Sequence, residues 1–71
     1  MNPIDIALRI ATSAHAGQLD RDGYPVILHP LTVGLMGHTD EEMMAGFLHD
    51  VVEDTSYSFE DLLHEGIPTG V

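Results

Sequence analysis

The chain of 71 residues contains no cysteine. Disulfide bonds therefore cannot stabilise it, and cysteine-based zinc fingers are excluded. A chain of this length forms at most one small domain, which buries only about 60% of its unfolded surface and is marginally stable alone. Metal binding, self-association or a missing partner segment are the remaining sources of additional stability.

Basic residues are almost absent, because two arginines stand against twelve acidic residues and the formal net charge is −10. This charge repels nucleic acids and anionic membranes, so we expect neither as a partner. A phosphate-rich substrate could be held only with a bound cation that offsets the field. The sequence also shows no apolar run of membrane-spanning length and no secretory leader, which makes the cytoplasm the expected location.

Helix-capping residues and apolar periodicity predict an all-α fold of about four helices. We expect these helices over residues 3–16, 30–37, 40–54 and 59–64. Asn2 is the expected N-cap of the first helix, Thr39 begins a capping box with Glu42, and Ser58 begins a weaker one. Residues 18–24 are expected to form a loop, and the short apolar run 26–28 has no evident strand partner nearby.

The third predicted helix carries a group of residues able to bind metal or transfer protons. At about 100° per residue, His49 lies one turn from Glu53, and Asp50 lies one turn from Asp54. Apolar side chains occupy the opposite side of this helix: Met44, Phe47, Leu48, Val51 and Val52. We therefore expect the apolar stripe to hold one polar, chemically active face in place.

His29 is the natural third ligand to an ion held by His49 and Asp50, because the following Pro30 fixes the geometry of a helix start. Two imidazoles and a carboxylate suit manganese, iron, zinc and similar ions. An ion so held activates water and polarises a phosphoryl oxygen, and Glu53 or Asp54 could act as base or orient that water. Each residue alone is weak evidence, but the combination is much more specific.

Three segments in order along the chain carry a resemblance to a known family. The first is His-Ala-Gly-Gln at 15–18, the second Asp-Gly-Tyr-Pro-Val-Ile-Leu-His-Pro at 22–30, and the third Leu-His-Asp-Val-Val-Glu-Asp-Thr at 48–55. With these segments the chain resembles the HD-domain hydrolases of the RelA/SpoT type, including their small stand-alone alarmone-hydrolase relatives. The resemblance covers almost the whole chain, and residues 58–62 look like the start of that family's next helix.

The resemblance implies an HD-domain-like helical fold, here a single partial domain over residues 1–71. It implies a divalent metal, with Mn²⁺ as the expected ion, held by His29, His49 and Asp50. The implied reaction is removal of pyrophosphate from the 3′ position of guanosine tetra- or pentaphosphate, a guanine nucleotide alarmone. By the same resemblance, Glu53 and Asp54 match the family's residues that assist the attacking water. Arg21 and Tyr24 lie in the loop that contacts the nucleotide in that family.

Two departures from the family pattern leave alternatives open. The family's further aspartate ligand, from a later helix, has no counterpart here, and the nucleotide loop keeps one arginine between Asp20 and Asp22. The alternatives are a catalytically impaired HD module that binds metal or nucleotide, a truncated fragment stable only as a homo-oligomer, and a hydrolase of another phosphate ester. Of the remaining histidines, His15 is expected to be packed and hydrogen-bonded, whereas His38 and His64 are expected to be exposed.

Overall fold

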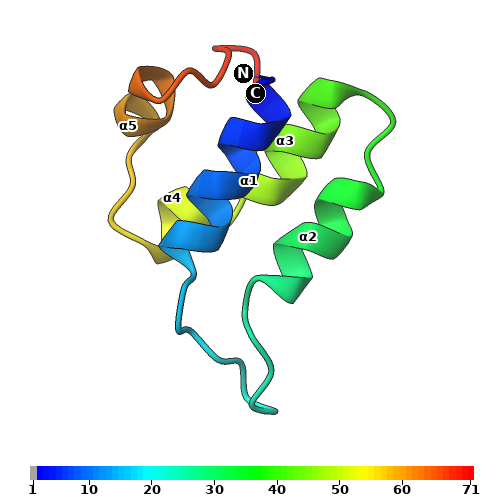
Figure 1. Cartoon of the computed structure of the whole chain (residues 1–71), viewed down its shortest axis with the longest axis vertical. Coiled ribbons are helices and arrows are strands. Elements are labelled where there is room, and N and C mark those ends of the chain that lie inside the picture. Colours follow the sequence, from blue (N-terminus) through cyan, green and yellow to red (C-terminus); the bar gives the residue numbers. More distant parts are fainter. Residues whose placement is uncertain (1) are drawn as a thin grey trace.

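The structure is a computed structural model that describes residues 2–71. Its helices are α1 (Pro3–Ala14), α2 (Leu28–Leu35), α3 (Asp40–Leu48), α4 (Val51–Asp54) and α5 (Phe59–His64) (Figure 1). The all-α prediction is confirmed, since the residues described form no strand beyond one isolated bridge. The four predicted helices are all present, but the third is divided into α3 and α4.

Local capping explains where three of the helices begin. The side chain of Asn2 accepts a hydrogen bond from the Ile4 amide at 2.9 Å, as expected for an N-cap. Ser58 and Asp61 form a complete capping box at the start of α5. Thr39 caps α3, but the capping box predicted there is incomplete, because the Glu42 carboxylate accepts from the His38 amide.

The prediction of one continuous helix over residues 40–54 is wrong, because the helix is interrupted between Leu48 and Val51. In an unbroken helix the Asp50 amide would donate to the Gly46 carbonyl. That carbonyl instead accepts a hydrogen bond from His49 Nδ1 at 2.7 Å. α3 ends at Leu48, next to this side-chain bond, and helical bonding resumes where the Asp54 amide donates to the Asp50 carbonyl at 2.9 Å.

The segment between α1 and α2 is more ordered than the loop predicted for it. The Asp20 amide donates to the Tyr24 carbonyl at 2.8 Å, and the Val26 amide donates to the Gln18 carbonyl at 2.9 Å. Residues 18–26 thus form a short hairpin, hereafter the hairpin, which extends away from the helices (Figure 1). The run 26–28 forms no strand, as expected, but Val26 does have a backbone hydrogen-bond partner that the sequence did not indicate.

The boundaries of the first two helices also differ slightly from prediction. α1 ends at Ala14 rather than Ala16, and Gly17 then adopts φ +79°, a left-handed turn conformation that glycine takes without strain. α2 runs from Leu28 to Leu35 rather than over 30–37. Pro30 is still in the first turn of α2, where a missing N–H breaks no helical hydrogen bond.

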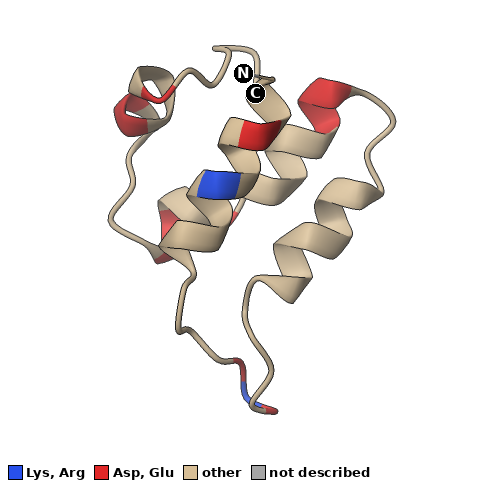
Figure 2. Cartoon of the chain, in the orientation of Figure 1, with Lys and Arg blue, Asp and Glu red and all other residues tan. Residues whose placement is uncertain are grey.

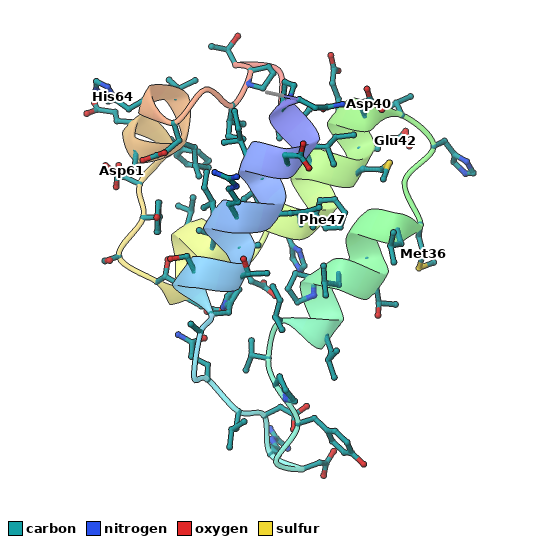
Figure 3. All side chains as sticks on the ribbon, in the orientation of Figure 1. Met36, Asp40, Glu42, Phe47, Asp61 and His64 are labelled. Carbon is teal, nitrogen blue, oxygen red and sulfur yellow. The ribbon has the colours of Figure 1, made fainter. Side chains whose placement is uncertain are left out.

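The core lies around α3, which packs against both α1 and α2. Figure 3 shows Phe47 directed into this interior, where it is 1% exposed, whereas Met36 extends outward and is 73% exposed. The predicted apolar face is confirmed, because four of its members are buried and Val52 is half-buried. Within Asn2–Val71, no helix has the length and apolar character needed to cross a membrane.

Candidate metal centre

Three side chains of metal-ligand type meet where α2 begins and α3 ends. His29 comes from the first turn of α2, whereas His49 and Asp50 form the turn between α3 and α4. One ligand atom from each lies within 4.8 Å of the others, and the two imidazole rings are edge to face with centroids 5.4 Å apart. The structure thus brings together the three residues that the sequence grouped as ligands.

The orientation of His49 favours a cation at this place. Its Nδ1 must carry the proton it donates to the Gly46 carbonyl. In the neutral imidazole, Nε2 then has a lone pair, and the Asp50 carboxylate oxygen faces it at 3.1 Å. Either a proton or a metal ion can lie between these two groups, and a set of two imidazoles and one carboxylate fits a divalent cation.

The hydrogen bond to Gly46 is the arrangement typical of metal-binding histidines, in which the nitrogen remote from the ion donates to a carbonyl. Such a bond fixes the tautomer and the ring orientation. The cluster is also open to solvent: the side chain of His49 is 38% exposed and that of Asp50 is 24% exposed. An ion could therefore enter without a rearrangement of the core.

Two glycines set the distance between the helices that carry the ligands. A methyl group on Gly46 would lie 2.6 Å from the Cα of Gly34, and one on Gly34 would overlap the ring of Phe47. Because both positions lack a side chain, α2 and α3 can approach closely, and this approach places His29 near His49. The sequence reasoning missed this contact, since two isolated glycines in separate helices give no signal of it.

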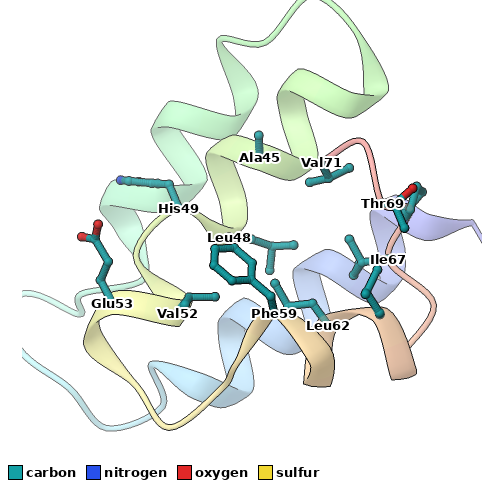
Figure 4. A pocket seen from close by; sticks show the side chains of 12 residues that line it. Ala45, Leu48, His49, Val52, Glu53, Phe59, Leu62, Ile67, Thr69 and Val71 are labelled. Atoms are coloured by element: carbon teal, nitrogen blue, oxygen red, sulfur yellow. The ribbon is translucent and has the colours of Figure 1, made fainter.

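Glu53 and Asp54, the predicted helpers of the attacking water, lie in α4 in different surroundings. Glu53 is exposed and lines, together with His49, a largely apolar hollow of about 570 Å³ between α3, α4 and α5. In Figure 4 the side chains of both residues extend toward the same side of this hollow. Asp54 is exposed and belongs neither to the hollow nor to the ligand cluster.

Arg21 and Tyr24, the predicted nucleotide contacts, lie in the exposed part of the hairpin. The Asp20 carboxylate accepts hydrogen bonds from the amides of Asp22 at 2.9 Å and Tyr24 at 3.0 Å. Asp20 therefore shapes the turn that presents Arg21. Figure 2 shows this basic position at the end of the hairpin, with acidic residues beside it.

Fold and cluster together define an all-α chain with a surface site of two histidines and one aspartate. A comparison with protein-family models finds no match. Among curated proteins, the chain is 42% identical over 66 residues to a GTP pyrophosphokinase of Streptomyces coelicolor, an alignment that covers 87% of this chain and 8% of the relative. It is 47% identical over 60 residues to a guanosine-3′,5′-bis(diphosphate) 3′-pyrophosphohydrolase of Haemophilus influenzae, with coverages of 79% and 9%.

A third relative is the bifunctional (p)ppGpp synthase/hydrolase SpoT of Escherichia coli, 40% identical over 60 residues, with coverages of 79% and 8%. These relatives carry both synthetase and hydrolase names, and the chain spans less than a tenth of their length. The chain belongs to the RelA/SpoT-type family.

Proposed function

We propose that this chain provides the metal-binding part of a phosphohydrolase that removes pyrophosphate from the 3′ position of guanosine tetra- or pentaphosphate. His29, His49 and Asp50 would hold the divalent ion, with Mn²⁺ as the proposed metal. The observation that carries the proposal is the orientation of His49, whose Nδ1 is occupied by Gly46 while its Nε2 faces the Asp50 carboxylate. The names of the Haemophilus and Escherichia relatives support the substrate and the reaction.

When bound, the ion would supply Lewis-acid chemistry, activating a water molecule and polarising a phosphoryl oxygen. Glu53, beside His49 on the edge of the hollow, can accept the proton of the attacking water at its carboxylate. Asp54 follows on the same short helix and would help to orient that water. Asp50 would hold the ion together with His29 and His49 and would offset part of its charge, whereas the hydrogen bond to Gly46 leaves His49 Nε2 available as a ligand atom.

Arg21 and Tyr24 would contact the nucleotide. The Arg21 guanidinium can form a charge-assisted hydrogen bond to a phosphate oxygen, and the Tyr24 ring, 62% exposed, offers a flat face to a base. The net charge of −10 opposes the approach of a polyphosphate, so the metal and Arg21 would both be needed to hold one.

The proposal is tested by measuring metal content and Mn²⁺-dependent release of pyrophosphate from guanosine tetraphosphate. The wild type is compared with His49→Ala and Asp50→Ala, and with His38→Ala as a control that removes an exposed histidine outside the cluster. Loss of both metal and turnover in the two cluster variants, with the control unchanged, is the expected result.

Other results would separate the alternatives. Stoichiometric metal in the wild type without turnover would replace the hydrolase with a metal-binding module. Turnover that persists in both cluster variants would place the reaction elsewhere. Failure of the wild type to bind Mn²⁺, Fe²⁺ or Zn²⁺ would refute the metal centre itself.

A further inference from the structure

His15 is a buried histidine that the proposed chemistry does not use. It follows α1 as its C-cap, and only 2% of its surface is exposed. Its Nδ1 lies 3.0 Å from the side-chain oxygen of Gln18, to which it donates. Its other nitrogen, Nε2, is buried and has no hydrogen-bond partner within residues 2–71.

The unpartnered nitrogen shows that packing alone does not account for this histidine. A buried polar group without a partner costs about 1–3 kcal/mol, and an apolar side chain of similar size would avoid that cost. What the imidazole adds to the core is therefore its one hydrogen bond to Gln18. The role of His15 therefore depends on the further contacts that Gln18 makes.

Gln18 connects the end of α1 to the hairpin and to α2. Its carbonyl accepts a hydrogen bond from the Val26 amide at 2.9 Å, and the Val26 carbonyl accepts one from the His29 amide at 3.2 Å. Three successive hydrogen bonds thus lead from the buried His15 to the backbone of a proposed metal ligand. The first of these is the bond between the two side chains, and it reinforces a backbone bond in which the Gln18 amide donates to the His15 carbonyl at 3.1 Å.

The hairpin has few other means of support. Every residue from 19 to 25 is exposed, including Leu19 at 64% and Tyr24 at 62%. Since no side chain of this segment is buried in the core, its direction relative to the helices depends on its base. That base is formed by Gln18 and Val26, and Gln18 is tied to the interior through His15.

We propose that His15 and Gln18 are a positioning pair, which fixes the hairpin so that Arg21 and Tyr24 face substrate bound at the metal centre. Neither residue of the pair touches substrate. This role depends on the proposed hydrolase function, but the attachment of the hairpin can be measured without turnover.

The test replaces Gln18 in two ways. Gln18→Leu removes the acceptor of the His15 hydrogen bond, whereas Gln18→Glu replaces the amide oxygen by a carboxylate oxygen that can also accept it. Amide hydrogen exchange is measured at Val26 and His29, whose amides bond within this chain of contacts, and at Ile10 and Ala11 in the buried part of α1. KM and kcat for guanosine tetraphosphate are measured in parallel with Mn²⁺ present.

We expect Gln18→Leu to accelerate exchange at Val26 and His29 at least tenfold, with Ile10 and Ala11 unchanged. KM should rise about tenfold with kcat within twofold, the effect of one lost hydrogen bond on substrate binding, and Gln18→Glu should restore both. Equal acceleration in α1 and the hairpin would show a merely structural role and overturn the proposal, as would unchanged exchange at Val26. Selective acceleration in a chain without turnover would support the attachment while refuting the hydrolase function.

Discussion

The cluster of His29, His49 and Asp50 and the hairpin are held in place by different interactions. The cluster rests on the core: α3 packs against α2 through Gly34 and Gly46, and the ring of Phe47 fills the interior beside them. The hairpin has no buried side chain from 19 to 25 and depends on hydrogen bonds at its base. Substitutions in the helix contact should therefore change the ligand geometry first, and substitutions in the exposed part of the hairpin, residues 19–25, should change substrate contact first.

The largest effect is expected for Asp50→Asn, which removes the negative charge facing His49 Nε2. We expect Mn²⁺ affinity to fall about 100-fold or more, because replacing even an outer partner of a metal ligand costs 10–100-fold. Asp54→Asn is the matched control, since it makes the same chemical change outside the ligand cluster. Isothermal titration with Mn²⁺ measures both, and equal losses would show that the acidity of the whole segment, rather than the cluster, attracts the ion.

A similar but smaller change in affinity is expected for Gly46→Ala, which forces α2 and α3 apart. The added methyl group would lie 2.6 Å from the Gly34 backbone, and overpacking of this kind destabilises a core by about 1–3 kcal/mol. Urea unfolding should show this loss, and Mn²⁺ affinity should fall about tenfold as His29 moves away. Gly70→Ala is the control, because its nearest neighbour is 3.9 Å away; comparable effects of both changes would contradict the role of the close helix contact.

Arg21→Ala should weaken the contact between the hairpin and the substrate without changing metal binding. We expect KM for guanosine tetraphosphate to rise about tenfold, as one charge-assisted hydrogen bond to phosphate is lost. Mn²⁺ affinity should stay unchanged, and the free energy of unfolding should change by less than about 0.5 kcal/mol because the residue is exposed. A weaker Mn²⁺ affinity in this variant would show that the two regions are coupled.

The smallest effect is expected for Ser58→Ala, which changes neither region. It removes the side-chain half of the capping box of α5 and should lower the free energy of unfolding by about 1 kcal/mol or less. Mn²⁺ affinity and KM should be unchanged, with Ser56→Ala as the control on an exposed serine outside the cap. A change in KM would mean that α5 takes part in the site.

Features fixed by neighbouring residues were predictable from the sequence. Asn2 and Ser58 start helices because their side chains bond amides two or three residues away, and the apolar face of α3 follows from helical periodicity alone. The grouping of His29 with His49 and Asp50 was also predictable, because ligand chemistry limits the choices. Their roles in metal binding and hydrolysis stay predictions until the ion is measured.

Features that depend on a contact between separate segments were not predictable. The end of α3 depends on which donor reaches the Gly46 carbonyl, and helical periodicity carries no information about that competition. The hairpin depends on the hydrogen bond between Val26 and Gln18 across a turn, and the sequence pattern of this segment does not predict that pairing. The close contact between Gly34 and Gly46 likewise follows from the packing of α2 against α3, which the sequence does not give.

The hydrogen bond from His49 to Gly46 lies at the end of α3 and also fixes the ring orientation of a proposed metal ligand. Removing the ring altogether, as in His49→Ala, would return the Gly46 carbonyl to the Asp50 amide and allow α3 and α4 to merge into one longer rod. Asparagine at this position could still donate from its side-chain amide and preserve the interruption, while offering no imidazole to an ion. Residue 49 therefore affects both the proposed metal site and the backbone between α3 and α4. Only a substitution that keeps the hydrogen-bond donor can remove the imidazole without changing the backbone.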